Sequence, residues 1–148
     1  MEPSLIKYGF SSDERGSVFF INNLDFKKVK RTYLVSNKKT KTVRAWHGHK
    51  IEEKWVSVEE GEFLVCLVKI DNFKKPDIKS KVYQFKLKKE DGILHIPNNY
   101  ANGAMNLSKI NSIRYFSSLS LKDSINDDFR FDSNFWDPWK IYKPNYYE

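Results

Sequence analysis

The sequence is poor in the residues that cross-link a chain or anchor it in a bilayer. It has a single cysteine in 148 residues, so a disulfide framework is excluded and a reducing compartment is expected. No apolar run approaches the roughly 18–20 residues that a membrane helix requires. The first residues, Met1 to Ser4, lack the basic and apolar regions of a secretory signal. We therefore expect a cytoplasmic protein with no membrane partner.

Acidic residues are outnumbered by basic ones, and the net charge is +7. Such an excess attracts either nucleic acid or a small anion such as a nucleotide diphosphate. The lysines occur in pairs at turn-like positions, for example Lys27-Lys28 and Lys88-Lys89, where they are solvated and protect strand edges. The sequence has neither a basic helix nor the basic and aromatic platform of RNA-binding sheets. We expect no nucleic-acid partner.

Aromatic and β-branched residues, by contrast, are abundant. Aromatic residues make up 16% of the chain, which is not a disordered composition, and the length suits a single domain over residues 1–148. Short apolar runs alternate with turn signals such as Glu60-Gly61. The predicted strands are residues 18–21, 31–35, 42–46, 54–58, 62–70, 81–87, 93–96 and 113–118. So many short strands predict an all-β sandwich or barrel.

Three other segments carry weaker signals. Residues 119–126 could form one short turn or helix, and no segment shows a sustained helical period. The tail from Phe129 is rich in Trp and Pro, so we expect a short irregular or helical segment packed over the barrel. Cys66 lies in an apolar run and is expected to be a buried core thiol rather than a nucleophile.

One short stretch concentrates the residues that could do chemistry. Side chains alternate along a strand, so His47 and His49 would share one face. Arg44, Trp46 and Lys50 would point the other way unless a bulge intervenes. Two imidazoles beside fixed positive charge suit either a metal site or proton transfer at a carbon that a carbonyl group makes acidic.

A His-x-His motif early in a series of short strands predicts a jelly-roll cupin barrel, also called a double-stranded β-helix. The second cupin motif would need a third histidine, but Asn102 stands at that position. A metal would then keep only His47, His49 and Glu53, and the Lys54 charge would oppose it. We expect no metal and no cofactor, and keep this three-residue set as an alternative.

The motifs follow one another in an order that can be compared with known families. They are Asp13-Glu14-Arg15-Gly16, Arg44-Ala45-Trp46-His47, Lys54, Leu94-His95-Ile96-Pro97 with Ala101-Asn102-Gly103, and Trp136-Asp137-Pro138. Together they resemble the dTDP-4-dehydrorhamnose 3,5-epimerase family. The His-x-His-Lys motif is also similar to that of the nucleotide-sugar 3,4-ketoisomerases. The resemblance implies a metal-independent dimeric cupin that acts on a nucleotide-linked 4-keto-6-deoxy sugar.

The same resemblance implies roles for individual residues. His47 takes the position of the base, Lys54 that of the lysine that stabilises the enolate oxygen, and Asp137 that of the carboxylate that orients the base. His49 acts as a base only in the ketoisomerase pattern. The implied substrate-binding residues are Arg15, Arg44, Asn102, Tyr100 and Tyr115.

The sequence also departs from the epimerase pattern. Ser120 or Leu121 stands where the epimerases carry the tyrosine that acts as acid on the opposite face, and Tyr100 could supply a substitute hydroxyl. We expect an epimerase that abstracts a proton at C3 and/or C5, in sugar biosynthesis for surface polysaccharides. A 3,4-ketoisomerase and a non-catalytic cupin that binds sugar nucleotides are the alternatives. We expect a homodimer that exchanges N-terminal strands; the nucleotide, the sugar and the stereocentre stay open.

Overall fold

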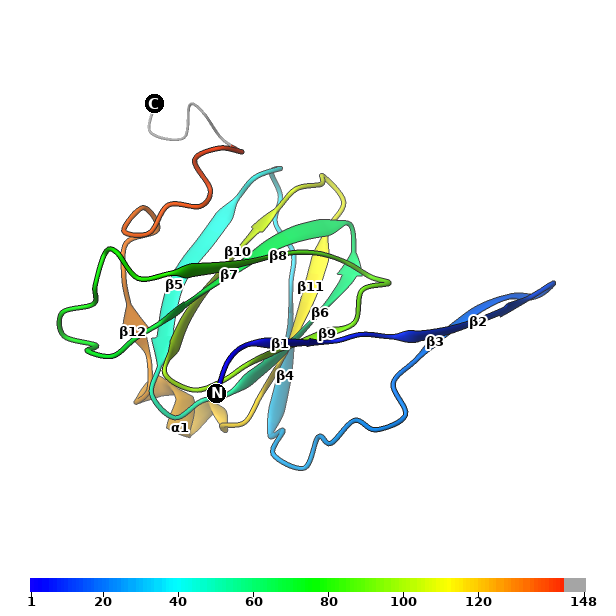
Figure 1. Ribbon diagram of the computed structural model, residues 1–148, viewed down its shortest axis with the longest axis horizontal. Coiled ribbons are helices and arrows are strands. Elements are labelled where there is room, and N and C mark those ends of the chain that lie inside the picture. The colour runs from blue at the N-terminus through cyan, green and yellow to red at the C-terminus, as the bar shows by residue number, and fades with distance from the viewer. Residues whose placement is uncertain (143–148) are drawn as a thin grey trace.

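The computed structural model describes residues 1–142, in which two five-stranded antiparallel sheets face each other (Figure 1). The first sheet has the order β1 (Ser4–Ile6), β9 (Ile93–Ile96), β6 (Lys54–Glu60), β11 (Ser112–Ser117) and β4 (Arg31–Val35). The second has the order β12 (Phe129–Arg130), β5 (Val43–His49), β10 (Tyr100–Asn106), β7 (Glu62–Lys69) and β8 (Val82–Lys88). This arrangement confirms the predicted all-β jelly-roll class.

The hydrophobic core lies between the two sheets. The first sheet contributes Val56 and Val58 of β6, and the second contributes Phe63, Val65 and Leu67 of β7. Leu64, Cys66 and Val68 of β7 are buried as well, on the outer face of the second sheet. Because β7 is covered on both faces, its sequence is a continuous apolar run rather than an alternating one.

The C-terminal segment supplies that outer cover. Trp136 and Trp139 are buried against Trp46, with ring centroids 5.4 Å from it in each case. Cys66 belongs to the same cluster, so the expectation of a buried thiol is confirmed, and burial raises its pKa. The short helix α1 (Leu121–Ile125) forms within the segment where one was predicted, and Ser120 caps it by accepting a hydrogen bond from the Asp123 amide.

One central strand, β10, was not predicted from the sequence. It reads Tyr-Ala-Asn-Gly-Ala-Met-Asn, and all seven of its residues are buried between β5 and β7. Its polar residues have partners that no local pattern reveals: Asn106, for example, accepts from the Asn37 side chain. Gly103 is required, because a Cβ atom there would lie 2.5 Å from that of Ala45. Tertiary contacts therefore override a weak strand propensity.

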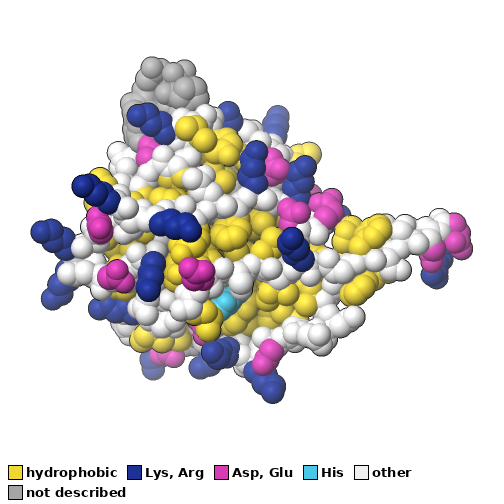
Figure 2. Space-filling model, in the orientation of Figure 1, with side chains coloured by type: hydrophobic (Ala, Val, Ile, Leu, Met, Phe, Trp, Pro, Cys, Tyr) yellow, Lys and Arg dark blue, Asp and Glu magenta, His cyan; other side chains and the backbone are white. Residues whose placement is uncertain are grey.

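The hairpin of β2 (Gly9–Asp13) and β3 (Gly16–Phe20) projects away from the two sheets (Figure 1). It exposes apolar side chains, among them Phe10 at 60% and Val18 at 61% of their surface, and Figure 2 shows this apolar surface at the base of the arm. A projecting apolar ribbon of this kind is typical of an interaction surface.

None of the helices in the described residues has the length and apolar character needed to cross a bilayer.

Candidate active site

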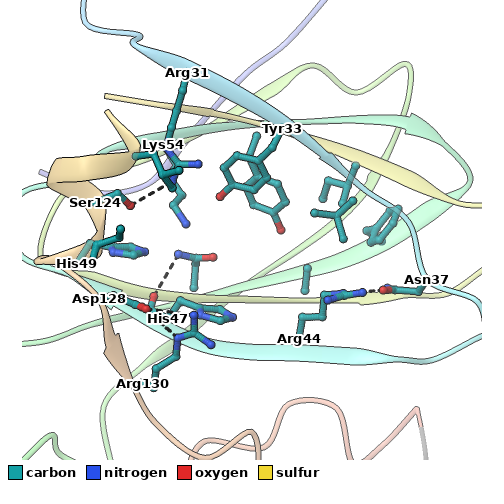
Figure 3. Close-up of a pocket in the computed structure, with 18 residues that line it drawn as sticks. Arg31, Tyr33, Asn37, Arg44, His47, His49, Lys54, Ser124, Asp128 and Arg130 are labelled. Carbon is teal, nitrogen blue, oxygen red and sulfur yellow. Dashed lines mark hydrogen bonds and ion pairs between the residues drawn. The ribbon is translucent and has the colours of Figure 1, made fainter. Parts of the chain in front are cut away.

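A cavity of about 380 Å³ opens between the two sheets, and most of the predicted catalytic residues line it (Figure 3). The first sheet contributes one wall and the second sheet the other, while the segment from α1 to β12 closes one end. The polar and charged lining residues are Arg31, Tyr33, Asn37, Arg44, His47, His49, Lys54, Asn102, Tyr115, Ser124, Asp128 and Arg130. Such convergence of titratable groups in a concave site is typical of an active site.

A β-bulge in β5 brings Arg44 onto the same wall as the two histidines. In the pairing of β5 with β10, Asn102 lies opposite His47 and Ala104 lies opposite Arg44. Two steps along β10 therefore match three steps along β5, and the register shifts between these two pairs. The extra residue on β5 puts the Arg44 side chain on the same face as His47, whereas a regular strand would put it on the opposite face. Arg44, expected to point away in a regular strand, therefore reaches the cavity, where its Nε donates to Asn37 Oδ1 at 2.7 Å.

His47 is the imidazole that is free to react. Its ring makes no hydrogen bond within the described part of the chain, and neither ring nitrogen is sealed from solvent. Burial lowers the pKa of His47 to about 4, and the positive charges of Arg130 and Lys54 contribute to the shift. His47 is therefore a neutral proton acceptor at pH 7, set in the cavity by β5 and by Asn102, whose amide donates to the His47 carbonyl oxygen.

His49 lies on the same wall, and its ring is fixed by a hydrogen bond to the backbone of Asp127. Its Nδ1 donates to the backbone carbonyl of Asp127 at 2.6 Å, so the lone pair of the neutral ring is on Nε2. Nε2 is enclosed and lies 3.7 Å from Oε2 of Glu52. Burial, followed by the charge of Lys54, lowers the pKa of His49, while Glu52 acts in the opposite direction.

Lys54 faces the histidines from β6, in the other sheet. Its Nζ lies 3.3 Å from Glu52 Oε2 and within 6 Å of the ring centres of Tyr33 (5.9 Å) and Tyr115 (5.6 Å). The two tyrosine rings are stacked at 5.1 Å. Burial raises the pKa of Tyr115, so its phenol keeps its proton. The wall opposite His47 thus carries one ammonium and two phenol groups (Figure 3).

Three arginines make the cavity strongly cationic. Arg44 lies at one end, and Arg31 and Arg130 lie toward the end that α1 closes (Figure 3). Asp128 is the one acidic side chain among the lining residues that the structure describes, and it is paired with Arg130 at 3.1 Å. The excess of fixed positive charge suits an anionic ligand, and guanidinium groups suit phosphate oxygens in particular.

Three of the predicted site residues lie elsewhere. Arg15 is at the tip of the projecting hairpin, paired with Asp13. Tyr100 is buried in the core, and its hydroxyl donates to the Met1 carbonyl at 3.2 Å; burial raises its pKa to about 12. Asp137 does not line the cavity, and both of its carboxylate oxygens are buried without a hydrogen-bond partner among residues 1–142. The acid close enough to act on the charge of His47 is Asp128 instead.

The alternative metal set is not brought together. Glu53 turns away from the cavity, accepts from Lys28 at 3.2 Å, and lies 2.9 Å from His95 Nε2. His95 in turn lies 5.2 Å from the Trp55 ring, outside the cavity lining. Residues 1–142 contain no group of three His, Cys, Asp or Glu side chains placed to hold a metal ion.

Sequence reasoning missed a group of residues that come from three separate segments. They are Arg31 and Tyr33 of β4, Glu52, and Asp127, Asp128 and Arg130 after α1. The adjacent acids Asp127-Asp128 at the end of a short predicted helix were the available signal. Glu52 and Glu53 could not be told apart, because the chain leaves the strand pattern between β5 and β6.

Comparison with known proteins places the chain in a family. The family model described as "FdtA: WxcM-like, C-terminal" matches residues 1–135. No curated protein matches the sequence. Among solved structures, a 3,4-ketoisomerase from Helicobacter canadensis is 21% identical, with 91% of this chain and 95% of that chain covered and a TM-score of 0.67.

Two further solved structures show the same fold. A mutant of the QdtA 3,4-ketoisomerase from Thermoanaerobacterium thermosaccharolyticum, in complex with TDP-4-keto-6-deoxyglucose, is 17% identical over 99% of this chain and 97% of that chain, with a TM-score of 0.67. The dTDP-4-dehydrorhamnose 3,5-epimerase from Bacillus anthracis, with TDP and PPi bound, is 18% identical over 93% and 85%, with a TM-score of 0.75. At these identities the likeness establishes the jelly-roll fold.

Proposed function

The chain belongs to the FdtA family of WxcM-like C-terminal domains, and we propose that it is an isomerase of nucleotide-linked keto sugars. The reaction is a proton transfer at a carbon next to the ketone, and we favour epimerisation at that carbon. The observation that carries the proposal is the placement of His47 and Lys54, which enter one cavity from opposite sheets. A neutral base and a fixed cation on opposite sides of a substrate are what enolate chemistry needs.

The steps follow from these two groups. A C4 ketone acidifies the C–H bonds at C3 and C5, and the unprotonated His47 imidazole takes one of these protons. The electron pair of the broken C–H bond moves to the ketone oxygen, which becomes an enolate. The Lys54 ammonium stabilises that negative charge. Return of a proton to the same carbon from the other face inverts the centre and restores the ketone.

Tyr33 and Tyr115 are the groups placed to return that proton. Both line the cavity on the wall that faces His47. Their phenols would replace the tyrosine that the sequence lacks near residues 120–121. Lys54 lies close to both rings, so it can stabilise the phenolate that forms when the proton leaves. In this proposal Arg44 binds the diphosphate of the substrate, and Arg31 and Arg130 add to the positive potential of the cavity.

A second candidate is the 3,4-ketoisomerase reaction, which the position of His49 favours. His47 and His49 line the same wall of the cavity. A transfer from C3 to C4 on one face of the sugar needs proton carriers on that one face. His49 would then deliver or remove the second proton, with its ring held by Asp127.

We also propose that the active form is a homodimer that exchanges the β2–β3 hairpin. The exposed Phe10, Val18, Phe19 and Phe20 are the apolar surface that a second copy would cover. Exchange would carry Arg15, at the hairpin tip, toward the partner's cavity, which gives it the predicted contact with the diphosphate. Light scattering with a Phe10→Ser/Val18→Ser variant tests this: we expect a dimer that dissociates in the variant, and a monomeric wild type would contradict it.

The catalytic proposal is tested in deuterated water with TDP-4-keto-6-deoxyglucose and related 4-keto sugars, followed by NMR. We expect deuterium at C3 or C5. Deuterium with an inverted centre identifies an epimerase, and a ketone moved from C4 to C3 identifies a ketoisomerase. Binding without exchange would contradict both reactions and indicate a sugar-nucleotide-binding protein.

A further inference from the structure

A buried carboxylate, that of Glu52, lies behind the cavity wall, next to His49 and Lys54. We propose that Glu52 is a positioning residue, which fixes the Lys54 ammonium at the cavity wall and stabilises the protonated imidazole of His49. The proposal rests on the proposed function for its catalytic consequence, but its electrostatic part concerns the free protein. Glu52 is outside the cavity lining and would act only through these two neighbours.

The Glu52 carboxylate lies next to two cationic side chains, Arg31 and Lys54. The Glu52 side chain is fully buried, so solvent does not screen its charge. Oε1 accepts a hydrogen bond from the Ser124 hydroxyl at 2.7 Å and lies 3.9 Å from Arg31. Oε2 lies 3.3 Å from Lys54 Nζ. A buried carboxylate is tolerated only where such partners compensate its lost hydration, so its position and those of its partners are coupled.

Hydrogen bonds to Asp127 also fix the backbone around Glu52. The Asp127 carboxylate accepts from the backbone amides of Lys50, Ile51 and Glu52, at 2.8, 2.9 and 2.8 Å. This clamp joins the loop between β5 and β6 to the segment after α1. It turns the side chain of Glu52 inward, whereas Glu53 turns outward to His95. The two adjacent glutamates therefore have different environments and offer a matched pair of variants.

The link to His49 follows from its tautomer. Nδ1 is committed to the Asp127 carbonyl, so a proton can be taken up only at Nε2. That atom and Oε2 of Glu52 lie 3.7 Å apart, both buried and both without a hydrogen bond in the described part of the chain. Protonation of His49 would convert this contact into an ion pair. Glu52 thus makes proton uptake by His49 more favourable, against the effect of burial and of Lys54.

The variants Glu52→Gln and Glu53→Gln test this assignment. Glutamine at position 52 keeps the volume and an acceptor for Ser124 but removes the charge. In Glu52→Gln we expect the pKa of His49, measured by NMR titration of the free protein, to fall, and kcat for deuterium exchange to fall about 10- to 100-fold because Lys54 loses its anchor. We expect the dTDP dissociation constant to stay within about threefold of wild type. In Glu53→Gln, kcat and the His49 titration should both remain those of the wild type.

A purely structural role would give a different result: a lower melting temperature in Glu52→Gln with an unchanged His49 titration and unchanged kcat, and this would overturn the assignment. If Glu52→Gln does not fold, Glu52→Asp keeps the charge but withdraws it from Lys54, and an unchanged kcat there would equally contradict the proposal. Wild type that exchanges no deuterium with any keto sugar would refute the proposed function, while the His49 titration would still decide the electrostatic role of Glu52.

Discussion

Nδ1 of His49 lies 2.6 Å from the backbone carbonyl oxygen of Asp127, to which it donates a hydrogen bond. The Asp127 carboxylate also accepts hydrogen bonds from three backbone amides of the loop that follows β5. Asp127 therefore fixes the ring of a cavity histidine and the entry into β6 at once. Because β6 carries Lys54 into the cavity, the geometry between the two walls depends on this one residue.

Loss of the Asp127 carboxylate should therefore destabilise the fold. Asp127→Asn replaces a charged acceptor of three amides, one of them that of buried Glu52, and we expect the free energy of unfolding to fall by about 1–3 kcal/mol. Urea denaturation followed by fluorescence measures the change. Asp128→Asn is the matched control, since Asp128 is exposed and makes no such bonds, and it should stay within about 0.5 kcal/mol of wild type. Equal effects of the two substitutions would contradict the clamp.

The charges around His47 should move its titration in opposite directions. Arg130 lowers the pKa of His47 and Asp128 raises it. We expect Arg130→Gln to raise the pKa of His47 from about 4 toward the ordinary 6.5, and Asp128→Asn to lower it further. NMR titration of the ring protons measures both. A shift of the same sign in the two variants would refute this description of the site.

Acid should destabilise the protein through His47. The folded-state pKa of about 4 lies below the unfolded value of 6.5, so the unfolded chain binds more protons between these pH values. Stability is therefore lost as the pH falls below 6.5. From pH 7 to pH 5 His47 should contribute a loss of about 2 kcal/mol, which a His47→Gln variant should not show. Denaturant unfolding of the two proteins at both pH values measures the difference, and parallel losses would contradict it.

Removal of the Lys54 charge should slow catalysis more than it weakens binding. In Lys54→Met we expect kcat for deuterium exchange to fall about 100- to 1000-fold, since the enolate loses its stabilising cation. The dissociation constant of dTDP, measured by calorimetry, should change far less, because Arg44 rather than Lys54 binds the diphosphate. A variant that binds dTDP poorly but turns over normally would assign Lys54 to binding instead.

Much of the fold, and the shared face of the two cavity histidines, followed from local sequence patterns. Alternation along β5 correctly put His47 and His49 on one face, and the apolar run around Cys66 marked the doubly buried β7. Arg44 needed a bulge that only the pairing with β10 reveals. The strand β10 itself escaped prediction because its polar residues are satisfied by distant partners.

The rest of the site depends on contacts between segments remote in the sequence. Glu52 and Glu53 cannot be distinguished in the sequence. Glu52 points inward because its backbone amide and those before it donate to Asp127, some 75 residues away. Arg31 and Tyr33 reach the cavity only because β4 pairs with β11. Asp137 was expected beside His47, but the Trp-rich segment that carries it packs behind the second sheet, on the face of Trp46.

The assignment of His47 as the base is tested by deuterium exchange into a nucleotide-linked 4-keto-6-deoxy sugar by wild type and by His47→Gln, with dTDP binding measured for both. We predict label at C3 or C5 with the wild type. In His47→Gln the exchange should fall at least about 100-fold with dTDP affinity retained, because the base is lost and the arginines remain. Exchange at the wild-type rate in His47→Gln would show that His47 is not the base and would contradict the proposed proton transfer.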